Sequence, residues 1–229
     1  MALIALRNMT KIYPAGNQNV AAVQELNLFI KEGEFAVLAG PSGSGKTTVL
    51  NIVGALDRPT EGAVAVDGAD YNEMKPKELA DFRLNRIGFI FQSYNLIPVL
   101  TAAENAEFTL MLQGVPPEER RNIITSIFSD LGIDGLEDRR PSDLSGGQQQ
   151  RVAIARAIAP EPAVILADEP TANLDSHTAE ELLQLMRNLN QEKNITFLFS
   201  SHDPLVIAHA KRVVRLRDGR LEDDIHQDA

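Results

Sequence analysis

Short apolar stretches separated by turn-forming residues dominate the first part of the chain. We expect strands at residues 3–6, 22–30, 35–39 and 63–68. The polar, glycine-containing segment 31–34 is typical of a turn. From 47 to 56 the apolar positions change to helical spacing, and 86–91 again favour a strand. This part is therefore predicted to be a β-sheet with a helix packed on it.

The middle of the chain is predicted to be helical. Apolar residues recur at helical spacing within 101–114 and 118–131, and two prolines at 116–117 separate these segments. Gly132 is expected to end the second helix. A third helix is expected at 148–159.

The last part of the chain is predicted to form a parallel sheet. Residues 163–167 and 195–199 are short apolar runs typical of buried strands, and 176–190 has helical spacing between them. A strand–helix–strand order predicts a right-handed crossover, in which ligands bind beyond the carboxyl ends of the strands. Polar residues follow three predicted strands, at 40–42, 168–169 and 201–202, so we expect them to converge.

Composition limits the class of protein. A length of 229 residues fits one domain, or one domain with a subdomain, and the absence of cysteine excludes disulfides and thiol catalysis. No apolar run approaches the roughly 20 residues that a membrane span needs, and the first residues do not resemble a secretory signal. A net charge of -10 argues against nucleic acid as a partner. The acidic tail, 221–229, is expected to be frayed.

The segment 40–47, Gly-Pro-Ser-Gly-Ser-Gly-Lys-Thr, fits the phosphate-binding P-loop pattern G-x4-G-K-T between a strand and a helix. We expect a nucleoside triphosphate to bind here, with Lys46 on its β- and γ-phosphates and the Thr47 hydroxyl on Mg²⁺. The residues expected to contact the nucleotide in this loop are Ser42, Gly43, Gly45, Lys46, Thr47 and Thr48.

Asp168 and Glu169 end a buried strand, which is the Walker B pattern. Asp168 would hold Mg²⁺, and Glu169 would orient or deprotonate the attacking water. Two adjacent acids could instead form a solvated edge or a helix cap, but the P-loop upstream favours the catalytic interpretation.

A second phosphate-binding element is the string Leu-Ser-Gly-Gly-Gln-Gln-Gln-Arg at 144–151. Ser145 and Gly147 would lie at a helix N-terminus, where backbone N–H groups attract anions. A simple N-cap is the alternative, and the chemistry alone does not say which phosphate is bound.

Together these motifs resemble the ATP-binding-cassette (ABC) ATPases, over residues 13–219. The resemblance implies that Tyr13 stacks on adenine, that Gln92 contacts Mg²⁺ or water, and that His202 contacts the γ-phosphate. Asp175 would lie in the D-loop between two subunits and could also cap the next helix. The other histidines, at 177, 209 and 226, are expected to be solvated. Asn173 and Ser201 depart from the commonest family residues, alanine and threonine, without removing a catalytic group.

The resemblance also implies a fold. We expect an α/β P-loop NTPase with a RecA-like parallel sheet core, an N-terminal antiparallel β subdomain and an inserted helical subdomain. The single ABC ATPase domain would span 1–229, with 1–92 and 160–229 as the core plus β subdomain and 93–159 as the helical subdomain.

In this family ATP and Mg²⁺ lie between two subunits in a head-to-tail homodimer. Each site would combine the P-loop, Gln92, Asp168, Glu169 and His202 of one subunit with Ser145 and Gly147 of the other. Hydrolysis would then open the dimer.

Segments 51–57, 95–105 and 200–204 look like the lipoprotein-release and macrolide-efflux branch (LolD/MacB-like). That branch implies a separate integral-membrane permease with four transmembrane helices and an extracytoplasmic domain. The chain would then lie at the cytoplasmic face of the inner membrane, with 93–114 receiving the permease. A cell-division ABC ATPase of the same branch and a soluble ABC ATPase of repair or translation are the alternatives.

Overall fold

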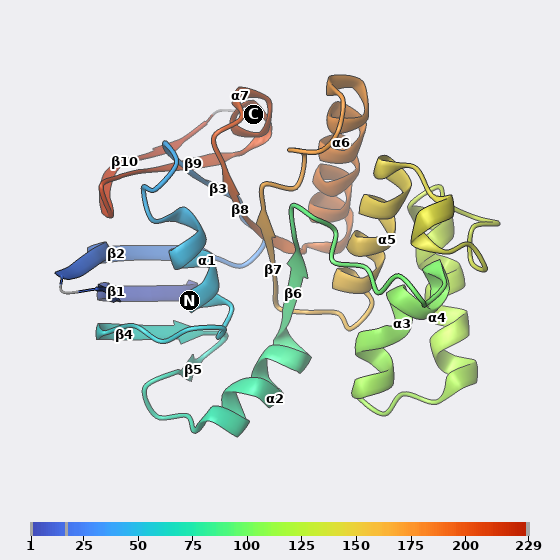
Figure 1. The fold of residues 1–229 in the computed structure, drawn as a ribbon, viewed down its shortest axis with the longest axis horizontal. Helices are drawn as coiled ribbons and strands as arrows, with labels where there is room; N and C mark the ends of the chain where they lie inside the picture. The colour runs from blue at the N-terminus through green and yellow to red at the C-terminus, as the bar shows by residue number, and fades with distance from the viewer. Residues whose placement is uncertain (1, 17, 228–229) are drawn as a thin grey trace.

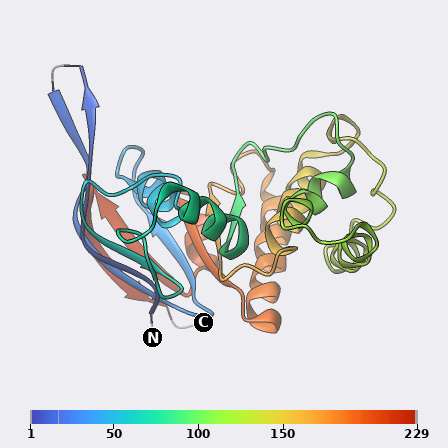
Figure 2. The same cartoon turned by 90° about the horizontal axis from the view of Figure 1, so that it is seen from below.

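Two β-sheets and the helices around them make up the structure, a computed structural model that describes residues 2–16 and 18–227 (Figure 1). The first sheet is antiparallel, with four strands in the order β2-β1-β4-β5. These strands are β1 (Ala2–Ala15), β2 (Gln18–Lys31), β4 (Glu61–Val66) and β5 (Ala69–Asp70). The hairpin of β1 and β2 projects beyond the body of the molecule (Figure 2).

The second sheet has six strands in the order β10-β9-β3-β8-β7-β6. They are β3 (Phe35–Ala39), β6 (Ile87–Ile90), β7 (Val164–Asp168), β8 (Thr196–Ser201), β9 (Arg212–Arg217) and β10 (Arg220–His226). All neighbours pair in parallel except β9 and β10, which form an antiparallel hairpin. The register pairs Ala39 with Ser201 and Asp168 with Ser200, so the carboxyl ends of β3, β7 and β8 meet at one edge.

The helices cover both faces of the second sheet. Their bounds are α1 (Lys46–Val53), α2 (Pro76–Arg86), α3 (Ala102–Leu112), α4 (Pro117–Asp130), α5 (Gly146–Ile158), α6 (Ser176–Lys193) and α7 (Pro204–His209). Figure 1 shows α3, α4 and α5 on the opposite side of the second sheet from the first sheet.

Two apolar cores hold these layers together. One lies between the first sheet, α1 and one face of the second sheet, and includes Leu6, Val49 and Leu198. The other covers the opposite face with α3 to α6, where Phe35 and Phe199 pack with ring centroids 4.6 Å apart. Burial of apolar surface in these cores is the main force that stabilises the fold. In 2–16 and 18–227, no helix combines the length and the apolar composition that a membrane crossing needs.

The predicted α/β architecture is confirmed, with its parallel core, antiparallel β sheet and helical region. The prediction of a frayed tail is wrong for 221–226, because β10 pairs with β9 along this segment. Residues 228–229 lie outside the described residues. Every residue of β10 is exposed, so no alternation of apolar and polar positions could reveal the strand.

The first strand was also predicted too short, since β1 runs on from residue 6 to residue 15. Its second half pairs with β2 through several register shifts and has mostly half-exposed side chains, so it lacks an apolar run. The helix α2 and the strands β5, β9 and β10 were not predicted.

Candidate functional site

The P-loop connects β3 to α1, and its glycines permit a tight backbone path. Gly45 has φ of 100°, and a Cβ there would come within 2.5 Å of the Ala22 carbonyl oxygen. Only glycine fits both conditions without displacing β2. The loop leads directly into the N-terminus of α1, where unpaired N–H groups and the helix dipole favour a phosphate.

Lys46 bends back over this loop. Its Nζ donates hydrogen bonds to the carbonyl oxygens of Gly40, at 2.7 Å, and Pro41, at 3.0 Å. The side chain is almost fully buried, which holds the ammonium group beside the P-loop. Phosphate oxygens placed in the loop would be stronger partners for this cation than neutral carbonyls.

A cavity of about 610 Å³ opens beside the P-loop. The loop contributes Ser42, Gly43, Gly45, Lys46, Thr47 and Thr48. Four other residues singled out from the sequence also line it: Tyr13, Gln92, Glu169 and His202. The sequence reasoning missed Ala22 and Ala172, whose small apolar side chains carry no chemical signal.

Thr47 lines the cavity and meets Asp168, which does not line it, because β7 ends beside the start of α1. The Thr47 hydroxyl donates to Oδ1 of Asp168 at 3.3 Å. In the described part of the chain, no cluster of three His, Cys, Asp or Glu side chains could hold a metal. One carboxylate and one hydroxyl nevertheless suit Mg²⁺, which commonly binds through few protein oxygens together with substrate phosphates and water.

Glu169 is held by the last residue of β8, Ser201, and by the residue after it, His202. Ser201 Oγ donates to its Oε2 at 2.9 Å, and His202 Nδ1 lies 2.7 Å from its Oε1. The Glu169 side chain is only 17% exposed, whereas that of His202 is 65% exposed. The carboxylate is therefore fixed in direction, and the imidazole reaches towards the cavity opening. Ser201 was noted in the sequence as a departure from the family and as one of the polar residues expected to converge beyond the strand ends, but its bond to Glu169 was not foreseen.

Tyr13 lines the cavity from β1 and is anchored by residues that the sequence did not single out. Its hydroxyl donates to Oδ2 of Asp57 at 2.7 Å. Lys11 Nζ binds the other carboxylate oxygen at 2.6 Å and lies 4.8 Å from the Tyr13 ring centroid. The Lys11 ammonium group therefore lies over one face of the Tyr13 ring. The bond to Asp57 restricts the orientation of the ring.

The ionisation of Tyr13 and Asp57 follows from these contacts. Partial burial and the bond to the Asp57 carboxylate raise the pKa of Tyr13. Burial alone would raise the pKa of Asp57, but hydrogen bonds from Lys11 and Tyr13 outweigh it and lower that pKa. Tyr13 therefore stays neutral and Asp57 stays charged over the physiological range.

Gln92 follows β6 and lines the cavity. Its backbone carbonyl accepts a hydrogen bond of 2.8 Å from Asn173 Nδ2. Asn173, a departure from the commonest family residue, thus ties the segment after Asp168 and Glu169 to the segment that begins with Gln92. No sequence signal indicated this contact between positions 81 residues apart.

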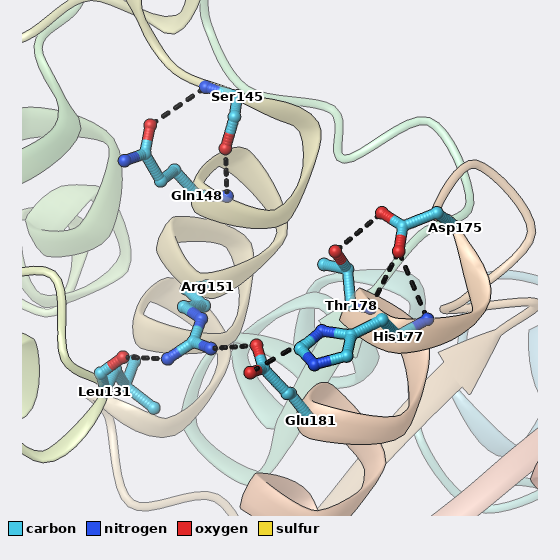
Figure 3. A network of polar contacts seen from close by, with 8 residues as sticks. All are labelled: Leu131, Ser145, Gln148, Arg151, Asp175, His177, Thr178 and Glu181. Carbon is cyan, nitrogen blue, oxygen red and sulfur yellow. Dashed lines mark hydrogen bonds and ion pairs between the residues drawn. The ribbon is translucent and has the colours of Figure 1, made fainter.

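Ser145, Gly147 and Asp175 do not line this cavity. Ser145 is the N-cap of α5, and its hydroxyl accepts from Gln148 N while Gln148 Oε1 accepts from Ser145 N (Figure 3). Asp175 caps α6 and accepts hydrogen bonds from the backbone N–H groups of His177 and Thr178. Its bonds with Thr178, through side chain and backbone, lower the pKa of Asp175. The helix-cap alternative considered for Ser145, and the cap expected at Asp175, are therefore observed.

The N-terminal part of α5 packs on α6. A Cβ at Gly147 would come within 2.7 Å of the Thr178 methyl carbon. Further along, Arg151 donates to the Leu131 carbonyl at 2.7 Å and contacts Glu181 at 3.5 Å (Figure 3). These contacts fix Ser145 and Gly147 at the molecular surface, away from the cavity of the same chain.

The expectation that the remaining histidines are solvated is wrong for His209. Its side chain is only 12% exposed, with Nε2 3.0 Å from Glu180. Its Nδ1 lies 3.0 Å from the Leu205 carbonyl, one turn earlier in α7. The side chain is buried because α7 packs against α6, which carries Glu180. His177 is 82% exposed, as expected. Asp203 is the N-cap of α7 and accepts a hydrogen bond from Leu205 N at 2.9 Å.

Comparison with known proteins agrees with this geometry. Residues 23–172 match the ABC transporter family. The ABC transporter ATP-binding protein MJ0796 of Methanocaldococcus jannaschii is 47% identical over 96% of this chain and 95% of that protein. The macrolide export ATP-binding/permease protein MacB of Syntrophobacter fumaroxidans is 44% identical over 97% of this chain but only 31% of that protein.

Two solved structures of a related protein are also similar to this chain. The dimeric structure of MJ0796 in a post-hydrolysis state with ADP and Pi covers 99% of both chains, with a TM-score of 0.91 and 44% identity. A second dimeric structure of MJ0796 has the same TM-score and identity. The chain therefore belongs to the ABC transporter family, as an ATP-binding cassette with ATPase activity.

Proposed function

We propose that this chain is the nucleotide-binding subunit of a transporter, that it dimerises on ATP, and that it powers a separate membrane permease. One observation carries the proposal: Lys46, Glu169 and His202 share a cavity that Ser145 and Gly147 of the same chain do not reach. A second copy can supply these two residues. The nucleotide site is thus incomplete in one chain.

ATP would bind with its phosphates in the P-loop and its adenine against the ring of Tyr13. Lys46 would exchange its bonds to the Gly40 and Pro41 carbonyls for bonds to the β- and γ-phosphates. Mg²⁺, held by Thr47, Asp168 and Gln92 together with the phosphates, would neutralise charge on the phosphate oxygens.

Hydrolysis requires an attacking water in line with the γ-phosphate. Glu169, fixed by Ser201, would orient this water and accept its proton. His202 would contact the γ-phosphate through Nε2 while Nδ1 stays near Glu169. These residues act by positioning and by stabilising charge, without a covalent intermediate.

The second copy would face the first head to tail. Its Ser145 and Gly147, at the N-terminus of α5, would bind the γ-phosphate from the opposite side, and Asp175 would lie at the interface. The dimeric structures of MJ0796 support this arrangement. After hydrolysis and loss of phosphate, the charge that joined the two faces is gone and the dimer opens.

The permease assignment rests on the MacB relatives. Their names combine ATP-binding and permease functions, and this chain spans about a third of their length. We propose that the permease is a separate chain of the LolD/MacB type, with four transmembrane helices and an extracytoplasmic domain. It would serve lipoprotein release, macrolide-type efflux or other periplasmic work, and would hold this chain at the cytoplasmic face of the inner membrane.

Within the chain we propose a division into a core with β subdomain, 1–92 and 160–229, and a helical subdomain, 93–159. The segment 93–114 of the helical subdomain would receive the permease. Val99, Met111 and Leu112 in this segment are exposed apolar side chains, which supports a protein partner there.

The Glu169→Gln variant tests the proposed dimer. It should bind ATP, hydrolyse it at least about 100-fold more slowly, and elute from a sizing column as a dimer only with Mg-ATP. The same variant with Lys46→Ala should remain a monomer, because it cannot hold the phosphates. A monomer in saturating ATP for Glu169→Gln alone would contradict the proposed dimer.

A further inference from the structure

Gln150 is a buried polar residue that the proposed mechanism does not use. Its side chain is fully enclosed on α5, and Nε2 donates a hydrogen bond of 2.7 Å to the Pro170 carbonyl. Its Oε1 has no hydrogen-bond partner in the described part of the chain. An unpaired buried acceptor lowers stability. An apolar side chain of the same shape would remove this unpaired acceptor but would leave the Pro170 carbonyl without the Gln150 donor.

The residue before Pro170 is the catalytic candidate Glu169, and its backbone is strained. Its φ is +46°, in the left-handed region that residues other than glycine seldom adopt. A following proline further favours extended backbone at this position. Such a conformation persists only where the surrounding structure imposes it.

Hydrogen bonds on both sides of Glu169 impose this conformation. Before it, the sheet is continued by the bond from Glu169 N to the Ser200 carbonyl, at 2.9 Å. After it, the Glu169 carbonyl accepts from Ala172 N at 3.2 Å, and the Pro170 carbonyl accepts from Gln150. Gln150 is the member of this set that lies on a helix, α5.

We infer that Gln150 is a positioning residue for ATP hydrolysis, acting through the Pro170 carbonyl on the backbone that aims the Glu169 carboxylate into the cavity. This inference rests on the proposed role of Glu169. The helix α5 would then have two roles, since Ser145 at its N-terminus would bind a phosphate and Gln150 would position Glu169. The two residues are five positions apart, which is about 7.5 Å along the helix axis.

In the proposed dimer, Ser145 would contact the partner's ATP, while Gln150 holds the catalytic segment of its own chain. Ser145 caps α5 and Gln150 lies on it, so this helix would serve both nucleotide sites.

The Gln150→Met variant of the full chain tests the inference, since methionine keeps the length of the side chain but cannot donate. We expect kcat to fall by about 10- to 100-fold, since a displacement of about 1 Å near the reacting atoms can cost about 100-fold. KM for ATP should stay within about twofold of wild type, because the P-loop is untouched. The midpoint of urea unfolding should change little, because the loss of the donor to the Pro170 carbonyl is offset by removal of the unpaired Oε1.

Asn190→Leu is the matched control for a purely structural amide. Asn190 is also buried and donates to backbone carbonyls, those of Gly33 and Ile195, at 2.9 and 2.7 Å. This variant should lower the unfolding midpoint and leave kcat of the folded protein unchanged. If Gln150→Met behaves in the same way, Gln150 is structural and the inference is overturned.

Two further measurements separate this inference from the proposed function. If Glu169→Gln abolishes turnover while Gln150→Met keeps wild-type kcat, only the inference fails. If Glu169→Gln keeps wild-type kcat, the catalytic role of Glu169 fails and the inference fails with it. In the double variant, Gln150→Met should cause little further loss beyond Glu169→Gln, because the two residues act as a unit. A further loss as large as that in the single variant would overturn the inference.

Discussion

The hydroxyl of Ser201 donates a hydrogen bond of 2.9 Å to Oε2 of Glu169. The same hydroxyl accepts a bond of 3.1 Å from Asp203 N, at the start of α7. Its hydrogen is therefore directed at the carboxylate, while a lone pair faces the backbone. One buried side chain thus joins the end of β8 to the catalytic candidate at the end of β7.

Replacing this hydroxyl should slow catalysis. We expect Ser201→Ala to lower kcat about tenfold, equivalent to about 1.4 kcal/mol, because the carboxylate loses a hydrogen bond that fixes its direction. Steady-state ATPase assays at saturating Mg-ATP would measure this. Ser201→Thr keeps the hydroxyl and should retain most of the activity, so an equal loss in both variants would contradict the explanation.

Tyr13 should contribute to ATP affinity mainly through its ring. Tyr13→Ala should raise the Kd for ATP by about tenfold, since stacking on an aromatic side chain is worth about 1–3 kcal/mol per base. Tyr13→Phe keeps the ring and loses only the bond to Asp57, so its Kd should rise less, by about two- to fivefold. Calorimetric titration would compare them, and equal losses would argue against stacking.

Lys46 is the charge on which phosphate binding depends most. Lys46→Ala should abolish measurable turnover and weaken ATP binding at least about 100-fold, because a charge-assisted bond to phosphate is lost in a nearly buried position. The fold should survive, since the ammonium group bonds only to two P-loop carbonyls in the described structure. A circular dichroism melt would verify folding, and turnover above one tenth of wild type would place the site elsewhere.

The ion pair of Arg212 and Asp224 should make stability depend on acid pH. Hydrogen bonds from Arg212, at 2.8 Å to each carboxylate oxygen, lower the pKa of Asp224 below its ordinary 3.8. A lowered folded-state pKa adds stability above the unfolded value, and this contribution is lost as pH falls through the folded value. The contribution is therefore complete at neutral pH and absent in strong acid.

Asp224→Asn tests this dependence. It should lower the free energy of unfolding at neutral pH by about 1–2 kcal/mol, and the difference from wild type should shrink below about pH 4. Urea titrations at several pH values would show this. Glu222→Gln removes the partner of Arg217 in a more exposed pair and should change stability by less than about 0.5 kcal/mol.

The parts of the site that lie together in the sequence could be predicted. The P-loop needs consecutive residues because its backbone itself wraps the phosphates, so its pattern is visible in eight positions. Asp168 and Glu169 were equally visible, because an apolar strand precedes them. The strand order of the parallel core then brings these segments to one edge.

The supporting contacts could not be predicted, because they join positions far apart in the sequence. Tyr13 and Asp57 are 44 residues apart, and Glu169 and Ser201 are 32 apart. The pattern predicts that residues 168–169 and 201–202 converge, but it does not say which side chains bond. Nothing in the local pattern around Asp57 indicates a partner. The exposed strand β10 was missed for a related reason, since pairing with β9 defines it and apolar burial does not.

The position of β10 at the end of the second sheet has a consequence for how the protein behaves at high concentration. An edge strand presents unpaired backbone groups, on which another chain can add a strand and start aggregation. Here the edge carries Glu222, Asp223 and Asp224 in succession. Arg212 and Arg217 balance Asp224 and Glu222, which leaves Asp223 as an acidic residue on this edge. A second copy of the same edge would bring two such carboxylates together, which disfavours pairing of the sheets edge to edge.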